Sequence, residues 1–307
     1  MRCAVLGGGG FIGSHLSEAL LAHGHEVRVF DRPNARFLQV LERSVAKLYK
    51  GEFSRPGDII NAISGCDVVY HLISTTVPQI SNDNPISDVE ANVLGTLHLL
   101  NAVKNVNVKK IVFSSSGGTV YGIPQEIPIK ESHPTEPTSS YGISKLTIEK
   151  YLHLYFNLYG LDYCILRPAN AYGIRQPTTG TQGVIGAFLH KAHHGSEITV
   201  WGDGSIVRDY ICVSDIVSAF IKAGEYEGES KIFNIGSGQG HSLNDIIGII
   251  EKVIQQPLRV KYLQGRAFDI PVNVLDISRA IKYLQWQPSV DLFEGISRVY
   301  EWTLRQE

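Results

Sequence analysis

Four consecutive glycines, Gly7 to Gly10, follow the first apolar run of the chain, and Gly13 comes three residues later. Gly7, Gly10 and Gly13 fit the spacing G-x-x-G-x-x-G, and Gly8, Gly10 and Gly13 fit G-x-G-x-x-G. Glycines at these spacings let a strand turn tightly into a helix. They also let the backbone approach a pyrophosphate, which then lies at the helix N-terminus. The run therefore favours a dinucleotide-binding strand–turn–helix over a glycine-rich turn without a ligand.

An acidic residue ends the second apolar run. Asp31 comes 18 residues after Gly13, where a carboxylate can accept hydrogen bonds from both ribose hydroxyls of an adenosine. The same carboxylate would repel the 2′-phosphate of NADP, although the positive charge of the neighbouring Arg32 weakens this repulsion. We therefore expect NAD rather than NADP as the cofactor.

Short apolar runs alternate with helical patterns through the first half of the chain. Apolar residues at helical spacing predict helices over 87–105 and 139–159. This alternation predicts an α/β protein with a doubly wound parallel sheet, the Rossmann arrangement, and a smaller, partly interleaved C-terminal substrate lobe. The near-continuous apolar character of the strands is typical of strands covered on both faces. The expected strands are residues 3–7, 26–31, 46–51, 67–74, 110–116 and 163–168.

The alternation of strands and helices breaks after about residue 170. FNIGSG at 233–238 is expected to return to the sheet as a late strand, and two amphipathic helices and a strand-like RVKYL follow it. We therefore expect an NAD-binding Rossmann domain over residues 1–169, with 207–238 returning to it. Residues 170–206 and 239–307 are expected to form the substrate-binding lobe.

Composition excludes several classes of function. The 307 residues carry a net charge of -2 and no basic block, which gives no footprint for nucleic acid. No segment reaches 18 apolar residues, so we expect no membrane span. The four cysteines form no C-x-x-C pair and are typical of a reduced, cytoplasmic protein. The histidines lack metal-ligand spacing, so no metal site is expected.

Tyr141 and Lys145 lie four residues apart in YGISK, on one face of the expected helix. A tyrosine, whose free pKa is about 10, is a poor base near neutral pH. A nearby ammonium and the positive charge of an oxidised nicotinamide favour the phenolate. A phenolate can take a proton from an alcohol while hydride leaves the same carbon. Y-x-x-x-K is a weak signal alone, but after the glycine run it indicates dehydrogenase chemistry.

A third motif, FSSSGGTVYG at 113–122, places three serines at the end of a buried strand. With it, the order of GGGGFIG, Asp31, YGISK, LRPANAYG and WGDGSIVRDYICVSD resembles the extended short-chain dehydrogenase/reductase family. The resemblance is closest to nucleotide-sugar 4-epimerases of the UDP-galactose 4-epimerase type, and it extends over nearly the whole chain to LQWQP at 284–288.

The resemblance implies an NAD-dependent isomerase that epimerises carbon 4 of a UDP-hexose. It would act by transient oxidation to the 4-keto sugar and re-reduction on the opposite face. Tyr141 would take the 4-hydroxyl proton, and Lys145 would lower the tyrosine pKa. The alternatives are an NAD(P)H-dependent reductase of a nucleotide 4-keto-sugar and, more distantly, a non-catalytic NAD-sensing protein. Such sensors typically lose the tyrosine or the lysine, and both are present here.

In the family, a serine or threonine at the end of strand five holds the sugar 4-hydroxyl beside the tyrosine. The usual motif is S-S-S-A-T-V-Y, and this chain is one residue longer. Ser116 is the first choice because glycine offers no hydroxyl, and Thr119 remains the alternative. Related dehydratases and decarboxylases carry a carboxylate just before V-Y-G. This chain has Gly118 and Thr119 there, so dehydration is not expected.

The family also supplies a set of binding positions. Arginines are expected on the diphosphate because their planar fork binds phosphate oxygens in pairs. Trp201 is expected against the uracil. The substrate-binding positions are Ser116, Tyr141, Asn170, Trp201, Arg208, Arg266, Asp269 and Asn273. The cofactor-binding positions are Gly7, Gly10, Phe11, Ile12, Gly13, Asp31, Glu52, Phe53, Leu72, Asn92, Ser114, Tyr141, Lys145 and Pro168.

One position bears on the choice of sugar. Asn273 falls where the family has a gate, and a tyrosine at that gate restricts the pocket to UDP-Glc and UDP-Gal. Asparagine is smaller, so UDP-GlcNAc and UDP-GalNAc are expected to fit as well. The TTVPQISNDNP loop after the fourth strand departs from the family and leaves the sugar open. The resemblance further implies a homodimer in which the 87–105 and 139–159 helices pair.

Overall fold

The computed structural model describes residues 1–44, 46–75, 78–177, 183–265 and 270–305. The chain divides into two compact units, each built from three separate segments. The first contains residues 1–122, 134–167 and 217–233, and the second contains residues 123–133, 168–216 and 234–307. This division places 123–133, 168–169, 207–216 and 234–238 in the second unit, whereas the sequence assigned these segments to the nucleotide-binding domain.

A seven-stranded sheet forms the framework of the first unit, in the order β10-β6-β5-β4-β1-β2-β3. Strands β1 to β6 pair in parallel, which confirms the doubly wound α/β fold. The order reverses between β1 and β4, and such a switch point opens a crevice at the carboxyl ends of the strands. The strands are β1 (Arg2–Leu6), β2 (Glu26–Asp31), β3 (Lys47–Lys50), β4 (Val68–His71), β5 (Lys110–Ser114), β6 (Asp162–Pro168) and β10 (Ile232–Ile235).

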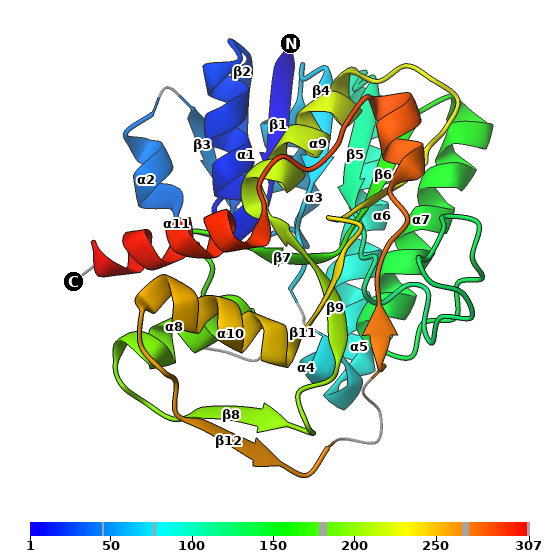
Figure 1. Cartoon of the computed structure of the whole chain (residues 1–307). Helices are drawn as coiled ribbons and strands as arrows, with labels where there is room; N and C mark the ends of the chain where they lie inside the picture. Colours follow the sequence, from blue (N-terminus) through cyan, green and yellow to red (C-terminus); the bar gives the residue numbers. More distant parts are fainter. Residues whose placement is uncertain (45, 76–77, 178–182, 266–269, 306–307) are drawn as a thin grey trace. The chain divides into compact units, whose positions relative to one another are not determined.

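Helices cover both faces of this sheet (Figure 1). On one face, apolar side chains of α3 (Pro56–Ile63), α6 (Gly95–Val106) and α7 (Ser140–Tyr159) form a single buried cluster with the strands. On the other face lie α1 (Phe11–Ala22) and α9 (Val213–Glu225), where the ring of Phe220 meets that of Tyr70. The short helix α2 (Leu38–Glu42) follows β2. The carboxyl edge of the sheet is thus framed by helices whose N-termini face it.

Two strands are shorter than the sequence predicts. The run at 67–74 forms a strand only over Val68–His71, and the run at 110–116 forms one only over Lys110–Ser114. The apolar and hydroxyl residues beyond these ends belong to loops, although β6 continues to Pro168, two residues past the partner of Ser114. Both loops therefore emerge at the carboxyl edge of the sheet.

The helix expected over 87–105 is a continuous helical segment with a wider turn inside it. Helix α5 (Pro85–Asp88) leads into a π-helical segment, η1 (Val89–Leu94), which continues as α6. A further short helix, α4 (Pro78–Asp83), precedes α5. π-helical turns are rare and often lie at functional sites.

The second unit combines two small sheets with three long helices. One sheet joins β11 (Gly240–Ser242), β9 (Val207–Cys212) and β13 (Val272–Asn273), and β7 (Asn170–Tyr172) also pairs with β9. The other pairs β12 (Val260–Leu263) with β8 (Ile198–Trp201). Helices α8 (Val184–His193), α10 (Leu243–Ile254) and α11 (Leu292–Leu304) pack around a separate apolar core. A π-helical turn, η2 (Ala280–Leu284), precedes α11.

Candidate active site

The glycine run forms the tight turn between β1 and α1. Gly7 has a φ of 85°, in the region that favours glycine, and its N–H donates to the carbonyl of Phe30 at 2.8 Å. A Cβ at Gly13 would lie 2.7 Å from Cα of Gly8 and closer still to the Gly7 carbonyl, so only glycine permits this packing. The close approach of α1 to the turn therefore depends on glycine at both positions.

The N-terminus of α1 is open to an anion. Its N-cap is Gly10, and among the described residues no side-chain cap accepts a hydrogen bond at this helix start. No acidic residue stands in the first turn, which begins with Phe11 and Ile12. Unsatisfied N–H groups and the helix dipole together favour a phosphate at this position. The cradle therefore fits the pyrophosphate of a dinucleotide.

Asp31 lies at the end of β2, beside the glycine turn. Its Oδ2 accepts from the N–H of Gly9 at 2.8 Å, and its Oδ1 accepts from the N–H of Arg32 at 2.8 Å. Burial raises the pKa of Asp31, and these two hydrogen bonds oppose the rise. The carboxylate is half-buried and keeps acceptor capacity for a pair of ribose hydroxyls.

The other expected cofactor positions of the first unit fall into two groups. Leu72 lies against the glycine turn, because a Cβ at Gly7 would lie 3.1 Å from the Leu72 carbonyl carbon. Phe53 is instead a core side chain, packed on the ring of His71 at 5.2 Å, and Glu52 is exposed. The backbone of Leu72 thus lies beside the glycine turn, whereas Phe53 belongs to the core under the sheet edge and packs on His71.

Asn92 fixes the loop that follows β4. Its side chain is buried, and its Oδ1 accepts from the N–H of Thr75 at 3.1 Å. Its Nδ2 donates to Oδ1 of Asp88 at 2.9 Å. His71, at the end of β4, is fully buried and contacts Thr96 through Nε2 at 2.9 Å. Burial and the charge of Lys145 lower the pKa of His71 to about 3, so it stays neutral.

Helix α7 presents Tyr141 in its first turn and Lys145 in the second. Ser139 caps the helix by accepting from the N–H of Gly142 at 3.2 Å. The N–H of Tyr141, which a helix would otherwise leave unpaired, donates to Oγ of Ser81 at 3.0 Å. The start of α7 is therefore fixed by side chains from two directions.

The two reactive groups lie on one face of α7. The ammonium nitrogen of Lys145 lies 5.5 Å from the ring centroid of Tyr141 and donates to the carbonyl of Ser114 at 2.8 Å. Burial lowers the pKa of Lys145 to about 8. Burial raises the pKa of Tyr141 to about 12, and a side-chain hydrogen bond with Ser74 opposes the rise.

The serine stretch separates into buried and accessible hydroxyls. Ser114 and Ser115 are buried, and the hydroxyl of Ser115 donates to Oε1 of Glu149. Ser116 and Thr119 are half-buried and belong to one turn, in which the N–H of Thr119 meets the carbonyl of Ser116 at 3.5 Å. Oγ1 of Thr119 is a buried oxygen without a hydrogen-bond partner among the described residues.

Gly142 brings the tyrosine helix against this hydroxyl turn. A Cβ at Gly142 would lie 2.8 Å from the carbonyl oxygen of Thr119 and 2.8 Å from Cβ of Pro137. Any larger residue would push α7 away from the turn. The backbone of the hydroxyl turn therefore lies directly beside the residue that follows Tyr141.

In the second unit, two predicted substrate residues are cross-strand neighbours. Arg208 of β9 pairs with Asn273 of β13 in a parallel ladder. Asn273 is buried, whereas Arg208 is half-buried and donates to the carbonyl of Val207 at 2.8 Å. Asn170 of β7 donates to the carbonyl of Asp209 at 3.0 Å, and 42% of Trp201 is exposed. The structure thus brings Arg208, Asn273 and Asn170 onto strands of one sheet.

Two further predicted positions, Arg266 and Asp269, lie outside the described residues. Pro168 is buried at the end of β6. Sequence reasoning missed a group of buried polar residues around α7: Ser81, Asp88, Ser144, Glu149 and Arg167. These residues do not form a motif of fixed spacing. The one signal in the sequence that could have indicated their burial was a polar residue within an otherwise apolar face of a helix.

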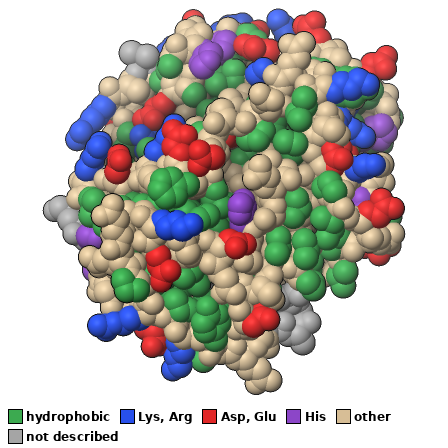
Figure 2. All heavy atoms as spheres, in the orientation of Figure 1, with side chains coloured by type: hydrophobic (Ala, Val, Ile, Leu, Met, Phe, Trp, Pro, Cys, Tyr) green, Lys and Arg blue, Asp and Glu red, His purple; other side chains and the backbone are tan. Residues whose placement is uncertain are grey.

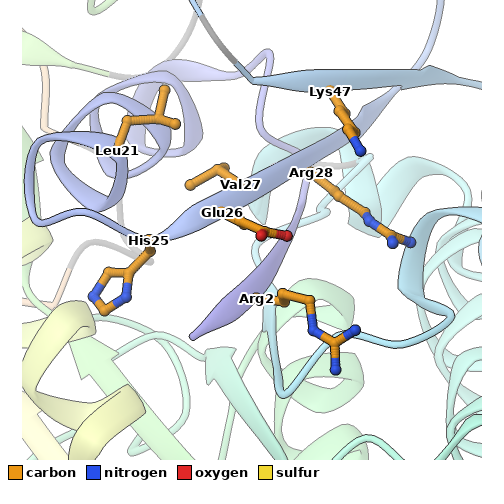
Figure 3. Close-up of a pocket in the computed structure, with 7 residues that line it drawn as sticks. All are labelled: Arg2, Leu21, His25, Glu26, Val27, Arg28 and Lys47. Atoms are coloured by element: carbon orange, nitrogen blue, oxygen red, sulfur yellow. The ribbon is translucent and has the colours of Figure 1, made fainter.

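A cavity of about 340 Å³ lies at the opposite, amino edge of the sheet (Figure 3). Its lining includes Arg2, Arg28, Glu26 and Lys47. The guanidinium of Arg28 donates to the carbonyl of Ser64 at 2.7 Å, and Arg2 lies 4.0 Å from Asp67. These partners already occupy two of the cations, and the cavity is remote from the glycine turn and Tyr141. It is not the site of the predicted chemistry.

Two broader observations bear on function. Within the described part of the chain, no cluster of three histidines, cysteines or carboxylates could hold a metal ion. None of the described helices combines the length and the apolar character of a membrane span. On the face drawn in Figure 2, basic and acidic side chains are intermixed. A groove of one charge sign, which nucleic acid would favour, is not seen on that face.

Comparisons with known proteins agree with this geometry. Residues 3–236 match the model of the NAD-dependent epimerase/dehydratase family. The chain is 38% identical to the UDP-glucose 4-epimerase of Mycolicibacterium smegmatis, over 98% of each chain. The solved UDP-glucose 4-epimerase of Thermotoga maritima, with UDP-glucose, is 34% identical, with a TM-score of 0.93 over 100% of this chain and 99% of that one. A UDP-N-acetylglucosamine 4-epimerase from Methanobrevibacter ruminantium is 31% identical, with a TM-score of 0.93 over 100% of this chain and 99% of that one.

Proposed function

The chain belongs to the NAD-dependent epimerase/dehydratase family, and we propose that it is a UDP-hexose 4-epimerase. One observation carries the proposal. Tyr141 and Lys145 lie on one face of α7, beside a turn that offers the hydroxyls of Ser116 and Thr119. This is the set of groups needed to exchange a proton with a sugar hydroxyl while hydride moves. The relatives that match along the full chain carry the same activity in their names.

NAD fits the cradle formed by the glycine turn, the open N-terminus of α1 and Asp31. Bound NAD would supply the acceptor and then the donor of the hydride at carbon 4 of the sugar, so no net cofactor would be consumed. Gly13 keeps the turn closed, and the N–H groups of Phe11 and Ile12 hold the pyrophosphate. Asp31 accepts from the adenosine ribose and excludes a 2′-phosphate.

The chain's own residues manage the proton. Tyr141 takes the proton of the 4-hydroxyl and later returns it. Its pKa of about 12 in the chain alone must fall before it acts as a base, and the positive charges of Lys145 and of oxidised NAD act in that direction. Thr119 offers a buried oxygen without a described partner, and Ser116 a half-buried hydroxyl. Ser116 is proposed to hold the 4-hydroxyl, and Thr119 is the alternative.

The second unit is proposed to hold the UDP moiety. The guanidinium of Arg208 suits the diphosphate, and Asn170 lies on the adjoining strand β7, opposite Tyr210 of β9. Asn273, the residue paired with Arg208, is small and offers an amide. We therefore infer that UDP-GlcNAc and UDP-GalNAc are accepted together with UDP-Glc and UDP-Gal. Trp201, Arg266 and Asp269 are further proposed contacts.

The enzyme is further proposed to be a homodimer that pairs through α7 and the segment 85–106. Exposed apolar side chains form a stripe on α7 at Ile143, Leu154 and Leu158, of which Leu158 is 60% exposed. In a monomer such a stripe would face water. Light scattering should give twice the monomer mass, and Leu158→Glu should halve it. Leu304→Glu, at an exposed leucine of α11, is the matched control.

A cytoplasmic location is proposed on the four free, buried cysteines, which suit a reducing compartment.

The function is tested with purified protein, a trace of NAD, and UDP-Glc, UDP-GlcNAc or UDP-GlcA supplied separately. Proton NMR should show many turnovers to the 4-epimer, with no net formation of reduced cofactor by absorbance. Tyr141→Phe is the matched control, since it removes only the acidic hydroxyl. If no sugar is epimerised and an added 4-keto sugar consumes reduced cofactor, the chain is a nucleotide 4-keto-sugar reductase instead.

A further inference from the structure

A buried carboxylate lies against the start of the tyrosine helix. Asp88, the last residue of α5, has no exposed surface. Its Oδ2 accepts from the hydroxyls of Ser144 at 2.5 Å and Ser140 at 3.0 Å. Its Oδ1 accepts from Nδ2 of Asn92 at 2.9 Å. All three of these donors are neutral groups. They hydrogen-bond both oxygens of the carboxylate but bring no positive charge to it.

The position of these donors connects Asp88 to both reactive side chains. Ser140 directly precedes Tyr141, and Ser144 directly precedes Lys145. Serines four residues apart lie on one face of a helix, so a single carboxylate oxygen holds the first turn of α7 from one side. Asn92, the third donor, also holds the loop after β4 through Thr75. Asp88 therefore joins that loop to the helix that carries the reactive pair.

The described hydrogen-bond donors of Asp88 differ in charge from those of Glu149. Burying a carboxylate is costly, and neutral donors could be satisfied by a neutral acceptor. Glu149, the other carboxylate near Lys145, is matched by Arg167 through contacts of 2.9 and 2.5 Å. The hydroxyl and amide donors of Asp88 carry no such charge. These described donors therefore hold the carboxylate without cancelling its charge.

We propose that Asp88 is a positioning residue for Tyr141 and Lys145: its carboxylate fixes the first turn of α7, and its charge sets the pH range in which the pair works. The inference rests on the proposed 4-epimerase function.

The directions of the pKa shifts agree with this role. Burial is the largest influence on both groups, and Asp88 raises the pKa of Lys145 and also that of Tyr141. Removing the charge should lower both pKa values and move the whole pH–activity profile toward lower pH. Helices η1, α4 and α7 pack against α5, and their described ionisable side chains include the exposed Glu90 and Asp83 and, on α7, Tyr141, Lys145 and Glu149. His71 on β4 feels the charge of Lys145 and stays neutral.

Asp88→Asn tests the charge while conserving the shape. The amide oxygen can still accept from Asn92, and the amide NH₂ can donate to the two serine hydroxyls, which rotate freely. The pH optimum of epimerisation should fall by about 1 unit, the shift expected for removing a unit charge within about 10 Å at an effective dielectric constant of about 20. Asp88→Glu, which restores the charge, should return the optimum toward that of the wild type.

Ser144→Ala is the matched control, because it removes one hydrogen bond to Asp88 and leaves the charge in place. It should lower kcat without moving the optimum. If Asp88→Asn does not fold, Ser140→Lys supplies the second test. It brings a cation to the half-buried edge of the network and should move the optimum in the same direction. An unmoved optimum in a folded Asp88→Asn protein, whatever its kcat, would overturn the proposal.

A substrate-free readout separates this inference from the proposed function. Ultraviolet difference absorbance of the NAD complex, with Tyr141→Phe subtracted, reports the phenolate of Tyr141. Its midpoint should fall in Asp88→Asn by the same amount as the optimum. A protein without epimerase activity but with this shift would refute the function and retain the role of Asp88. An active enzyme without the shift would do the reverse.

Discussion

Gly13→Ala is the most direct test of the cofactor cradle. In the structure, a Cβ at this position would lie 2.7 Å from Cα of Gly8 and closer to the Gly7 carbonyl, which is backbone that cannot swing aside. The turn or the helix must therefore shift. Overpacking of this kind costs about 1–3 kcal/mol. If this free energy is lost from the NAD complex, the affinity for NAD should fall by roughly 5- to 150-fold.

Isothermal titration of NAD into the variant measures this directly, and thermal unfolding reports stability in the same sample. The matched control is Gly57→Ala in α3, because a Cβ at Gly57 meets nothing within 4 Å. That variant should bind NAD like the wild type. Leu100→Ala serves as a second control, since it should destabilise the core by about 2–5 kcal/mol while leaving NAD affinity of the folded protein unchanged. Unaltered NAD affinity in Gly13→Ala would refute the idea that this turn cradles the pyrophosphate.

Three further predictions follow from the described contacts. Burial lowers the pKa of Lys145 to about 8, and only the charged form of this lysine supports the phenolate. The epimerisation rate should therefore fall as pH rises through about 8, and Lys145→Arg should move that loss to higher pH. A rate that keeps rising well above pH 8 would contradict this prediction. Glu149→Gln leaves the buried guanidinium of Arg167 with a weaker partner and should lower unfolding stability by about 3–5 kcal/mol in chemical denaturation. The exposed pair Glu294–Arg298 is its control, and Glu294→Gln should cost under about 1 kcal/mol. Asp31→Ser should narrow the preference for NAD over NADP at least tenfold, or about 1.4 kcal/mol, in competitive binding; an unchanged preference would remove Asp31 from the ribose site.

Local patterns predicted the framework of the first unit. The glycine turn, the strands from Arg2 to Pro168 and helix α7 follow from apolar periodicity and from short-range capping. The ends of two strands were overestimated, at His71 and at Ser114, because a run of apolar or hydroxyl residues does not reveal where a strand gives way to a loop.

The polar network around α7 could not be predicted in the same way. Asp88 and Ser144 are 56 residues apart, and nothing in either local segment indicates the other. The π-helical turn at Val89–Leu94 likewise has no periodic signature distinct from that of an ordinary helix. Tyr141 and Lys145 were recognised from their spacing, but the rise of the tyrosine pKa depends on burial that only the fold supplies.

The first unit closes only with its last segment, residues 217–233, which supplies most of α9 and the first half of the outer strand β10. During synthesis from the N-terminus, the ribosome must therefore release about three quarters of the chain before that sheet can be completed. Until then β6 has an uncovered edge, and segments of the second unit have already been made between its parts. A chain truncated after Arg167 would expose this edge to other nascent chains. The order of synthesis therefore leaves β6 open to pairing with a strand of another chain until β10 has been made.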